Sequence, residues 1–328
     1  MVSPRYSYQP LQSREIRLLQ LHPGEKQTKI QLSLVHVYLQ DNVDFEALSY
    51  TWGDGADRVP IACNEAGDVL EVTRNCELAL RALRRPDTMR ILWVDNISID
   101  QGNIEERNSQ ILLMPDIYHG SARVVAFLGD SSVDSDIGMD FISDDAKTIQ
   151  SGNRPFIGKL HRKAIDSILE RAYFERAWII QEILLAKDIL VVLGDRAVEW
   201  KAFSSTVSYV NANKKLHFGK AYRSSTPAVV HWRDKSAVTR PRTLLHLLDK
   251  TRYCKATDPR DKVYALLAIS PEKDEKSLAP DYSLSPTEVF LSIARYLLVR
   301  YDNLDVLCHC QGTPSPHGLP SWVPDWSI

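Results

Sequence analysis

The sequence has no long apolar run. No stretch approaches the roughly 20 apolar residues that a helix needs to cross a bilayer. The first residues, Met1-Val-Ser-Pro-Arg-Tyr-Ser-Tyr8, also lack the apolar segment of a secretory signal peptide. We therefore expect no membrane-spanning segment and predict a soluble, cytoplasmic protein.

Excess charge of one sign is also absent. Lys and Arg number 40 and Asp and Glu 42, which leaves a net charge of -2. Such a chain has no overall field to attract nucleic acid or an anionic membrane, and its short basic runs at 81–90 and 233–242 are typical of solvated surface. The composition excludes neither enzymes nor protein-binding modules, but it argues against a nucleic-acid partner.

Cysteine is sparse, and its spacing suits neither a disulfide framework nor a metal site. The five cysteines are an odd number in 328 residues, as is typical of reduced intracellular thiols. Cys308-His309-Cys310 places its potential ligands next to one another, with no second pair at the spacing of a zinc finger. We predict no metal and no disulfide.

Two common catalytic patterns are missing as well. The sequence has no glycine-rich phosphate loop of the Rossmann or P-loop type, which argues against hydride transfer and ATP-dependent chemistry. It also offers no paired carboxylates and no Ser-His-Asp arrangement. Chemistry for which one glutamate suffices would fit such a sequence.

What the chain does contain is an alternation of apolar strands and amphipathic helices between residues 45 and 194. This order predicts an α/β fold with a mainly parallel sheet, strands at 46–51, 91–95, 123–128 and 189–193, and helices on both faces. An antiparallel pair at 15–21 and 30–39 is expected at one edge of the sheet, and a hairpin at 58–73. Past Trp200 the pattern becomes mostly helical, so we predict domains at 1–200 and 201–328.

Three local features complete the prediction. Residues 90–99 are mostly apolar and predict one buried strand, while 130–155 predict a mobile insert or a small helix. Pro115 lies inside the helix predicted at 105–119 and should kink or split it. Gly53 and Asp100 follow two of the predicted strands, and the carboxyl ends of such strands are where α/β sheets place ligands.

One carboxylate stands out in the segment 176–186, Arg-Ala-Trp-Ile-Ile-Gln-Glu-Ile-Leu-Leu-Ala. In a helix Trp178 and Glu182, four residues apart, lie one above the other on an otherwise apolar face. A carboxylate in such surroundings is costly unless a partner or a ligand compensates it. The alternative is a surface Glu that reaches solvent past Trp178 or pairs with Arg176.

Four blocks of sequence together resemble the HET domain, the heterokaryon-incompatibility domain of filamentous fungi. They are 47–53 (Ala-Leu-Ser-Tyr-Thr-Trp-Gly), 92–101 (Leu-Trp-Val-Asp-Asn-Ile-Ser-Ile-Asp-Gln), 106–118 and 176–182. The resemblance covers about residues 15–194, and 258–268 and 319–326 resemble segments often found downstream of the domain. Ser98 stands where the family usually has Cys, which argues against a catalytic thiol there, and Pro115 replaces an ordinary helix residue.

The HET domain is in turn distantly similar to TIR domains, flavodoxin-like modules of cell-death signalling, some of which cleave NAD. This similarity implies a TIR-like fold and matches Ser49-Tyr50 and Leu92-Trp-Val-Asp95 to the first two TIR strands. It also matches Trp178 to Glu182 with the TIR helix that carries the glutamate used for NAD cleavage. The resemblance therefore implies Glu182 as the catalytic carboxylate, with NAD as substrate and no bound cofactor.

Several residues are candidates to bind the dinucleotide. They are Ser49, Tyr50, Trp52, Gly53, Asp95, Arg107 and Trp178. Tryptophan rings offer stacking surfaces, hydroxyls and Asp95 offer hydrogen bonds to ribose or phosphate, and Arg107 offers a cation. Each also has a structural alternative: Tyr50 as packing, Asp95 as a helix cap, and Arg107 as an ion-pair partner of Asp95 or Asp100.

Two classes of function remain open. In the first, Glu182 cleaves NAD, its depletion drives cell death, and activity depends on self-association. In the second, the domain is a non-catalytic module that self-associates and passes on a death signal from an upstream receptor protein. A pocket with Glu182 facing Tyr50 or Trp52 favours the enzyme, and a closed sheet edge with Glu182 in a salt bridge favours the scaffold.

Overall fold

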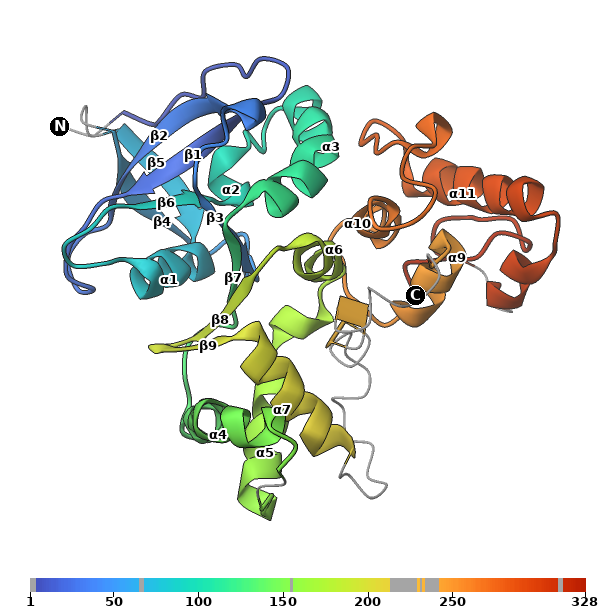
Figure 1. Cartoon of the computed structure of the whole chain (residues 1–328). Coiled ribbons are helices and arrows are strands. Elements are labelled where there is room, and N and C mark those ends of the chain that lie inside the picture. Colours follow the sequence, from blue (N-terminus) through green and yellow to red (C-terminus); the bar gives the residue numbers. More distant parts are fainter. Residues whose placement is uncertain are drawn as a thin grey trace. The chain divides into compact units, whose positions relative to one another are not determined.

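The computed structural model describes residues 4–64, 68–153, 156–212, 229–230, 232–233, 242–311 and 315–328 (Figure 1). The chain divides into two compact units. Unit 1 comprises Met1–Tyr173 and Ala186–His217, and unit 2 comprises Phe174–Leu185 and Phe218–Ile328. The division into domains at 1–200 and 201–328 stays a prediction.

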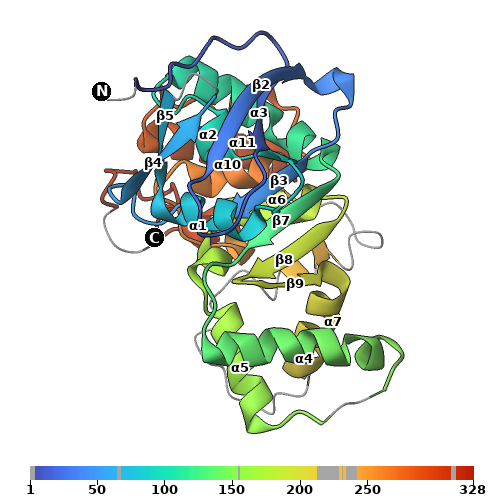
Figure 2. The same cartoon turned by 90° about the vertical axis from the view of Figure 1, so that its left-hand side faces the viewer.

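Unit 1 is built on one mixed sheet. Its described strands are β1 (Glu15–Leu21), β2 (Gln31–Tyr38), β3 (Glu46–Tyr50), β4 (Arg58–Cys63), β5 (Asp68–Thr73), β6 (Arg90–Trp93), β7 (Arg123–Phe127), β8 (Ile189–Leu193) and β9 (Arg196–Glu199). They lie in the order β5-β4-β2-β1-β6-β3-β7-β8-β9. Figure 2 shows this sheet from a second side.

The four strands predicted as the parallel part of the sheet are confirmed as neighbours. β6, β3, β7 and β8 run parallel to one another, with Glu46 opposite Leu92 and Val124 opposite Ile189. Numbered along the chain, their spatial order is 2-1-3-4. The sheet as a whole is mixed rather than mainly parallel, because β1–β2, β1–β6, β4–β5 and β8–β9 are antiparallel pairs.

The antiparallel pair β1–β2 is present but does not lie at an edge of the sheet. β1 also pairs with β6, and β2 pairs with β4. The prediction failed because the alternation of polar and apolar residues in β1 suggested a half-exposed strand. Every residue of β1 except Gln20 is buried, including Glu15 and Arg17.

The helices of unit 1 pack against the sheet or against one another. They are α1 (Arg74–Leu83), α2 (Asp95–Ser98), α3 (Ile104–Gly120), α4 (Val133–Gln150), α5 (Lys159–Leu169) and α7 (Trp200–Ala212), with the 3-10 turn η1 (Leu39–Asp41). Thr73 caps α1 by accepting a hydrogen bond from Cys76 N. The apolar side chains of α1 share one core with Leu48 and Tyr50 of β3. Ala47 and Ser49 point to the opposite face because side chains alternate along a strand.

Three local predictions can be compared with the structure, and one of them, a helix within 130–155, agrees with it. The apolar run 90–99 is not one strand, because β6 ends at Trp93 and α2 begins at Asp95, where Val94 N donates to Ser98 Oγ. Pro115 does not split α3, which continues from Ile104 to Gly120. The insert at 130–155 contains the 18-residue helix α4, which packs against α5 and α7.

Unit 2 is helical in its described part. Its elements are α6 (Trp178–Leu185), α9 (Leu244–Lys250), α10 (Asp261–Leu267) and α11 (Pro286–Tyr301), with the 3-10 turns η4 (Lys276–Leu278) and η5 (Asp305–His309). The helix expected in the segment 176–186 begins only at Trp178. A 3-10 turn, η2 (Ala172–Glu175), precedes α6, and between them Arg176 forms a β-bridge with Lys255 while Ala177 N donates to Lys255 O. α10 packs against both α6 and α9.

No described helix combines the length and the apolar character needed to cross a membrane.

Candidate functional site

The carboxyl ends of β3 and β6 meet in unit 1, and two predicted site residues contact each other there. Trp52 Nε1 donates a hydrogen bond of 2.8 Å to Asp95 Oδ2. The other carboxylate oxygen of Asp95 accepts from Asn96 N at 2.7 Å, and its backbone oxygen accepts from Gln101 Nε2 at 3.0 Å. Asp95 therefore fixes the half-exposed indole of Trp52 and the amide of Gln101 at one place.

Gly53 gives the loop after β3 its close approach to α1. Its φ of +76° lies in the left-handed region, and a Cβ there would come within 2.8 Å of Asn75 Nδ2. The same amide donates to Thr51 O at 3.1 Å. Glycine is thus required both by the backbone and by the space beside Asn75.

Ser49 and Tyr50 lie on opposite faces of β3, and each is only 1% exposed. Ser49 Oγ shares a hydrogen bond of 2.7 Å with the hydroxyl of Tyr173. The Tyr50 hydroxyl shares one with the thiol of Cys76, whose pKa is raised to about 12, chiefly by burial. Both hydroxyls are therefore engaged inside the core of unit 1.

Ser98 occupies the position where the resemblance would place a cysteine. It is fully buried, its hydroxyl accepts from Val94 N at 3.2 Å, and its carbonyl accepts from Arg17 Nη1 at 2.9 Å. The side chain closes the turn of α2. Its surroundings are those of a structural residue.

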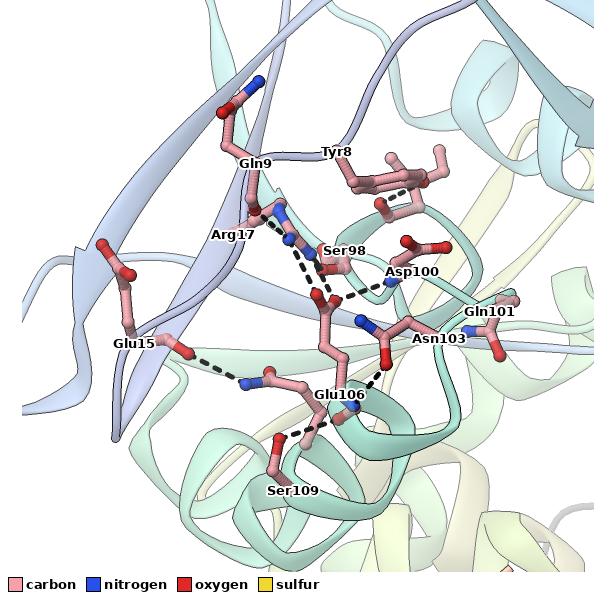
Figure 3. A network of polar contacts seen from close by, with 12 residues as sticks. Tyr8, Gln9, Glu15, Arg17, Ser98, Asp100, Gln101, Asn103, Glu106 and Ser109 are labelled. Atoms are coloured by element: carbon pink, nitrogen blue, oxygen red, sulfur yellow. Dashed lines mark hydrogen bonds and ion pairs between the residues drawn. The ribbon is translucent and has the colours of Figure 1, made fainter.

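Next to this turn lies a buried ion pair that the sequence did not reveal (Figure 3). Arg17 of β1 contacts Glu106 of α3 through both terminal nitrogens, at 2.5 and 2.9 Å. Glu106 also accepts from Asp100 N at 2.7 Å, and Arg17 donates to Gln9 O at 2.5 Å. The Tyr8 ring lies under the guanidinium, 4.8 Å from its Cζ.

This network holds the start of α3 against β1 and the N-terminal segment. Asn103 caps α3 by accepting from Glu106 N at 3.1 Å. Arg107, a predicted phosphate ligand, follows Glu106 in the sequence and is half-buried. Arg107 and Asp95 both belong to unit 1. The Arg17–Glu106 ion pair joins the turn beside them to β1.

The two remaining predicted residues, Trp178 and Glu182, belong to α6 of unit 2. Trp178 is half-buried and Glu182 is 2% exposed. Arg233 Nη1 donates to Ile183 O at 2.6 Å near the end of this helix. Glu182 is therefore a buried carboxylate on an apolar helix, as its position among Ile and Leu residues predicted.

Among the residues that the structure describes, no three His, Cys, Asp or Glu side chains gather closely enough to bind a metal ion.

Comparison with known proteins identifies the domain. The family model "Heterokaryon incompatibility protein (HET)" matches residues 45–182, from the residue before β3 into α6. The chain is also 28% identical, over 400 aligned positions, to "Heterokaryon incompatibility protein 6, OR allele" of Neurospora crassa. That alignment covers 96% of this chain and 58% of the relative, so the chain spans a little over half the length of the curated protein it matches. No solved structure matches the chain. Residues 45–182 of this chain therefore match the HET domain family.

Proposed function

We propose that this chain acts in fungal heterokaryon incompatibility, as the part of the protein that triggers cell death. The observation that carries this proposal is the combined likeness to the HET family and to an incompatibility protein along 96% of the chain. We include in this proposal a receptor protein that acts upstream of this chain.

We further propose that the trigger is cleavage of NAD, with Glu182 as the catalytic carboxylate. Three observations support this. The family match extends to Glu182. This carboxylate is buried, and a charge acts more strongly inside a protein than in water. The parallel strand order 2-1-3-4 is also that of flavodoxin-like sheets, which bind ligands beyond the carboxyl ends of their strands.

The reaction suits a single carboxylate. The nicotinamide ring is cationic in NAD and leaves as a neutral molecule when its bond to ribose C1′ breaks, so no general acid is needed. Water then adds to C1′ and releases a proton, which gives ADP-ribose and nicotinamide. A carboxylate near the ribose stabilises the positive charge that develops on the sugar, as in glycosidases. Glu182 is proposed for this role.

The test is nicotinamide release from NAD by the purified chain. Glu182→Gln keeps the size of the side chain but removes its charge and replaces one acceptor oxygen by an amide donor, so circular dichroism must show that the variant stays folded. We expect a loss of at least about 100-fold in rate, the effect of removing one preorganised electrostatic group. Glu105→Gln, an exposed carboxylate of α3, is the matched control. Equal release by the wild type and Glu182→Gln would exclude this role for Glu182.

A second function is favoured by a different observation. Trp52 donates a hydrogen bond to Asp95, and Ser49 shares one with Tyr173. These side chains at the strand ends therefore stabilise the fold. This suits a non-catalytic module that signals by self-association. Light scattering over a range of concentrations tests assembly, and the enzyme proposal adds that specific activity rises as the chain assembles. An oligomer that releases no nicotinamide would favour the signalling module, whereas activity independent of assembly would remove self-association from the enzyme mechanism.

A further inference from the structure

A hollow of about 770 Å³ lies on unit 1, between the β4–β5 hairpin and the turn that follows α2. The residues that line it are Arg5, Arg58, Pro60, Val69, Glu71, Gln101 and Gly102. Its volume is in the range of small-molecule sites, about 300–1,000 Å³. None of the residues proposed for NAD binding lines it.

The hairpin supplies one wall through alternate residues. Pro60 of β4 lies opposite Glu71 of β5, and Val69 lies two residues from Glu71, so these side chains share the outer face. The intervening residues Ile61 and Leu70 point the other way, into the core shared with α1. The outer face therefore combines apolar surface with charged groups on a rigid, well-anchored pair of strands.

Two arginines bring positive charge to this wall. Arg58 is anchored by two backbone oxygens, Gly55 O at 3.1 Å and Glu71 O at 3.0 Å, through Nε and Nη1. Its Nη2 makes no hydrogen bond to any residue that the structure describes. Arg5 lies on an N-terminal segment that extends the sheet, because Tyr6 N donates to Val69 O and Val69 N to Pro4 O, both at 2.9 Å.

The opposite wall is held by the Arg17–Glu106 pair. Glu106 fixes the turn that carries Gln101 and Gly102 by accepting from Asp100 N, while Arg17 fixes the N-terminal segment by its bond to Gln9 O (Figure 3). Gln101 uses its Nε2 to bind Asp95 O, so its side-chain oxygen is left as an acceptor toward the hollow. One buried ion pair therefore holds two of the segments that line this hollow.

We propose that this hollow binds a nucleoside diphosphate. Arginine guanidinium groups match phosphate oxygens in geometry and charge, and the two phosphate groups of a diphosphate offer one partner to each of Arg5 and Arg58, which line the same hollow. Pro60 and Val69 offer an apolar surface to a base. The Gln101 oxygen and the Glu71 carboxylate accept hydrogen bonds from an amino group or ribose hydroxyls. The proposal is independent of NAD cleavage, because all the lining residues belong to unit 1 and none is Glu182.

The experiment is calorimetric titration of the whole chain with ADP, with adenosine and pyrophosphate as partial probes. We expect ADP to bind more tightly than either probe, and Arg58→Ala and Arg5→Ala each to weaken ADP binding by about tenfold or more, since each removes a charge-assisted hydrogen bond. Arg85→Ala, an exposed arginine outside the hollow, is the matched control. Glu182→Gln should bind ADP as the wild type does, even if NAD cleavage is lost.

Three outcomes would overturn the proposal. They are no binding of ADP, binding that the Arg5 and Arg58 variants leave unchanged, and pyrophosphate binding as tight as that of ADP, which would reduce the hollow to a general anion site. Circular dichroism of each variant checks that the fold persists. Because Arg5 and Arg58 are exposed, their replacement by Ala leaves the core of unit 1 intact.

Discussion

Arg17 and Glu106, 89 residues apart in the sequence, form a bidentate ion pair whose side chains are 0% and 7% exposed. Burying such a pair costs desolvation energy, so its main contribution is to fix the geometry of the segments that it joins. Here it joins β1, the N-terminal segment and the turn between α2 and α3. The conformation of the strand-end region therefore depends on one pair of charges.

The first prediction concerns the stability that this pair protects. Glu106→Ala should lower the free energy of unfolding by about 3–5 kcal/mol, because it leaves the Arg17 charge buried without its partner. Urea denaturation followed by circular dichroism measures the change. Arg14→Ala is the matched control, since the Arg14–Asp116 pair is more than half exposed and should cost less than about 1 kcal/mol.

Replacing both charges separates the loss of one partner from the loss of the pair. Arg17→Met combined with Glu106→Leu should be less destabilising than Glu106→Leu alone, since no uncompensated charge remains in the core. A double variant that is as unstable as the sum of its two single variants would show that the two side chains act independently.

The second prediction concerns pH. Burial by itself raises the pKa of Glu106, but hydrogen bonds from Arg17 and Asp100 N and the charge of Arg17 outweigh it, so the pKa lies below its ordinary value of 4.5. Because the folded-state pKa is the lower one, the resulting stability is present above pH 4.5 and is lost as the pH falls through the folded-state pKa. The stability gap between wild type and Glu106→Gln should therefore be widest near neutral pH and shrink in acid. A gap that stays constant down to acid unfolding would contradict the assignment, and Glu105→Gln serves as the control.

The sequence predicted the parallel part of the fold because its signals are local. Apolar strands that alternate with amphipathic helices identify β6, β3, β7 and β8 without knowledge of distant contacts. The position of β1 inside the sheet was missed because Arg17 resembles a solvent-facing residue in the alternation pattern. Its burial is compensated by Glu106 and by the backbone oxygens of Ser98 and Gln9, and a pairing across 89 residues leaves no mark in either local pattern.

The candidate site, too, was predictable where its signals are local and not where it depends on distant contacts. The polar residues that follow β3 and β6 indicated a meeting point, and the Trp52–Asp95 bond is located there. The apolar neighbours of Glu182 correctly indicated a buried carboxylate. The hollow lined by Arg5, Arg58 and Gln101 was not predicted, because its walls come from an N-terminal segment, a hairpin and a turn that the fold alone brings together.

The third prediction tests the glycine at the end of β3. Gly53→Ala should cost about 1–3 kcal/mol, because alanine disfavours a φ of +76° and its Cβ would meet Asn75 Nδ2 at 2.8 Å. Adding Asn75→Ala removes the steric contact but not the backbone strain, so it should recover only part of the loss. Thermal unfolding of the variants measures both steps. Gly55→Ala is the control, since a Cβ at Gly55 meets no atom within 4 Å.

The fourth prediction concerns the reactivity of the thiols, because only a thiolate attacks a disulfide reagent. Burial raises the pKa of Cys63 and Cys76 to about 12, and Cys254 is also buried, whereas Cys308 is exposed. At pH 8 the native chain should therefore react rapidly with an aromatic disulfide at Cys308, and Cys308→Ser should remove that fast phase. Cys310 is half-buried and burial raises its pKa, so it should react more slowly than Cys308. The three buried thiols should react only after denaturant opens the core. Rapid labelling of Cys76 in the native chain would mean that the Tyr50–Cys76 contact opens readily, and that the packing between β3 and α1 is looser than their shared core indicates.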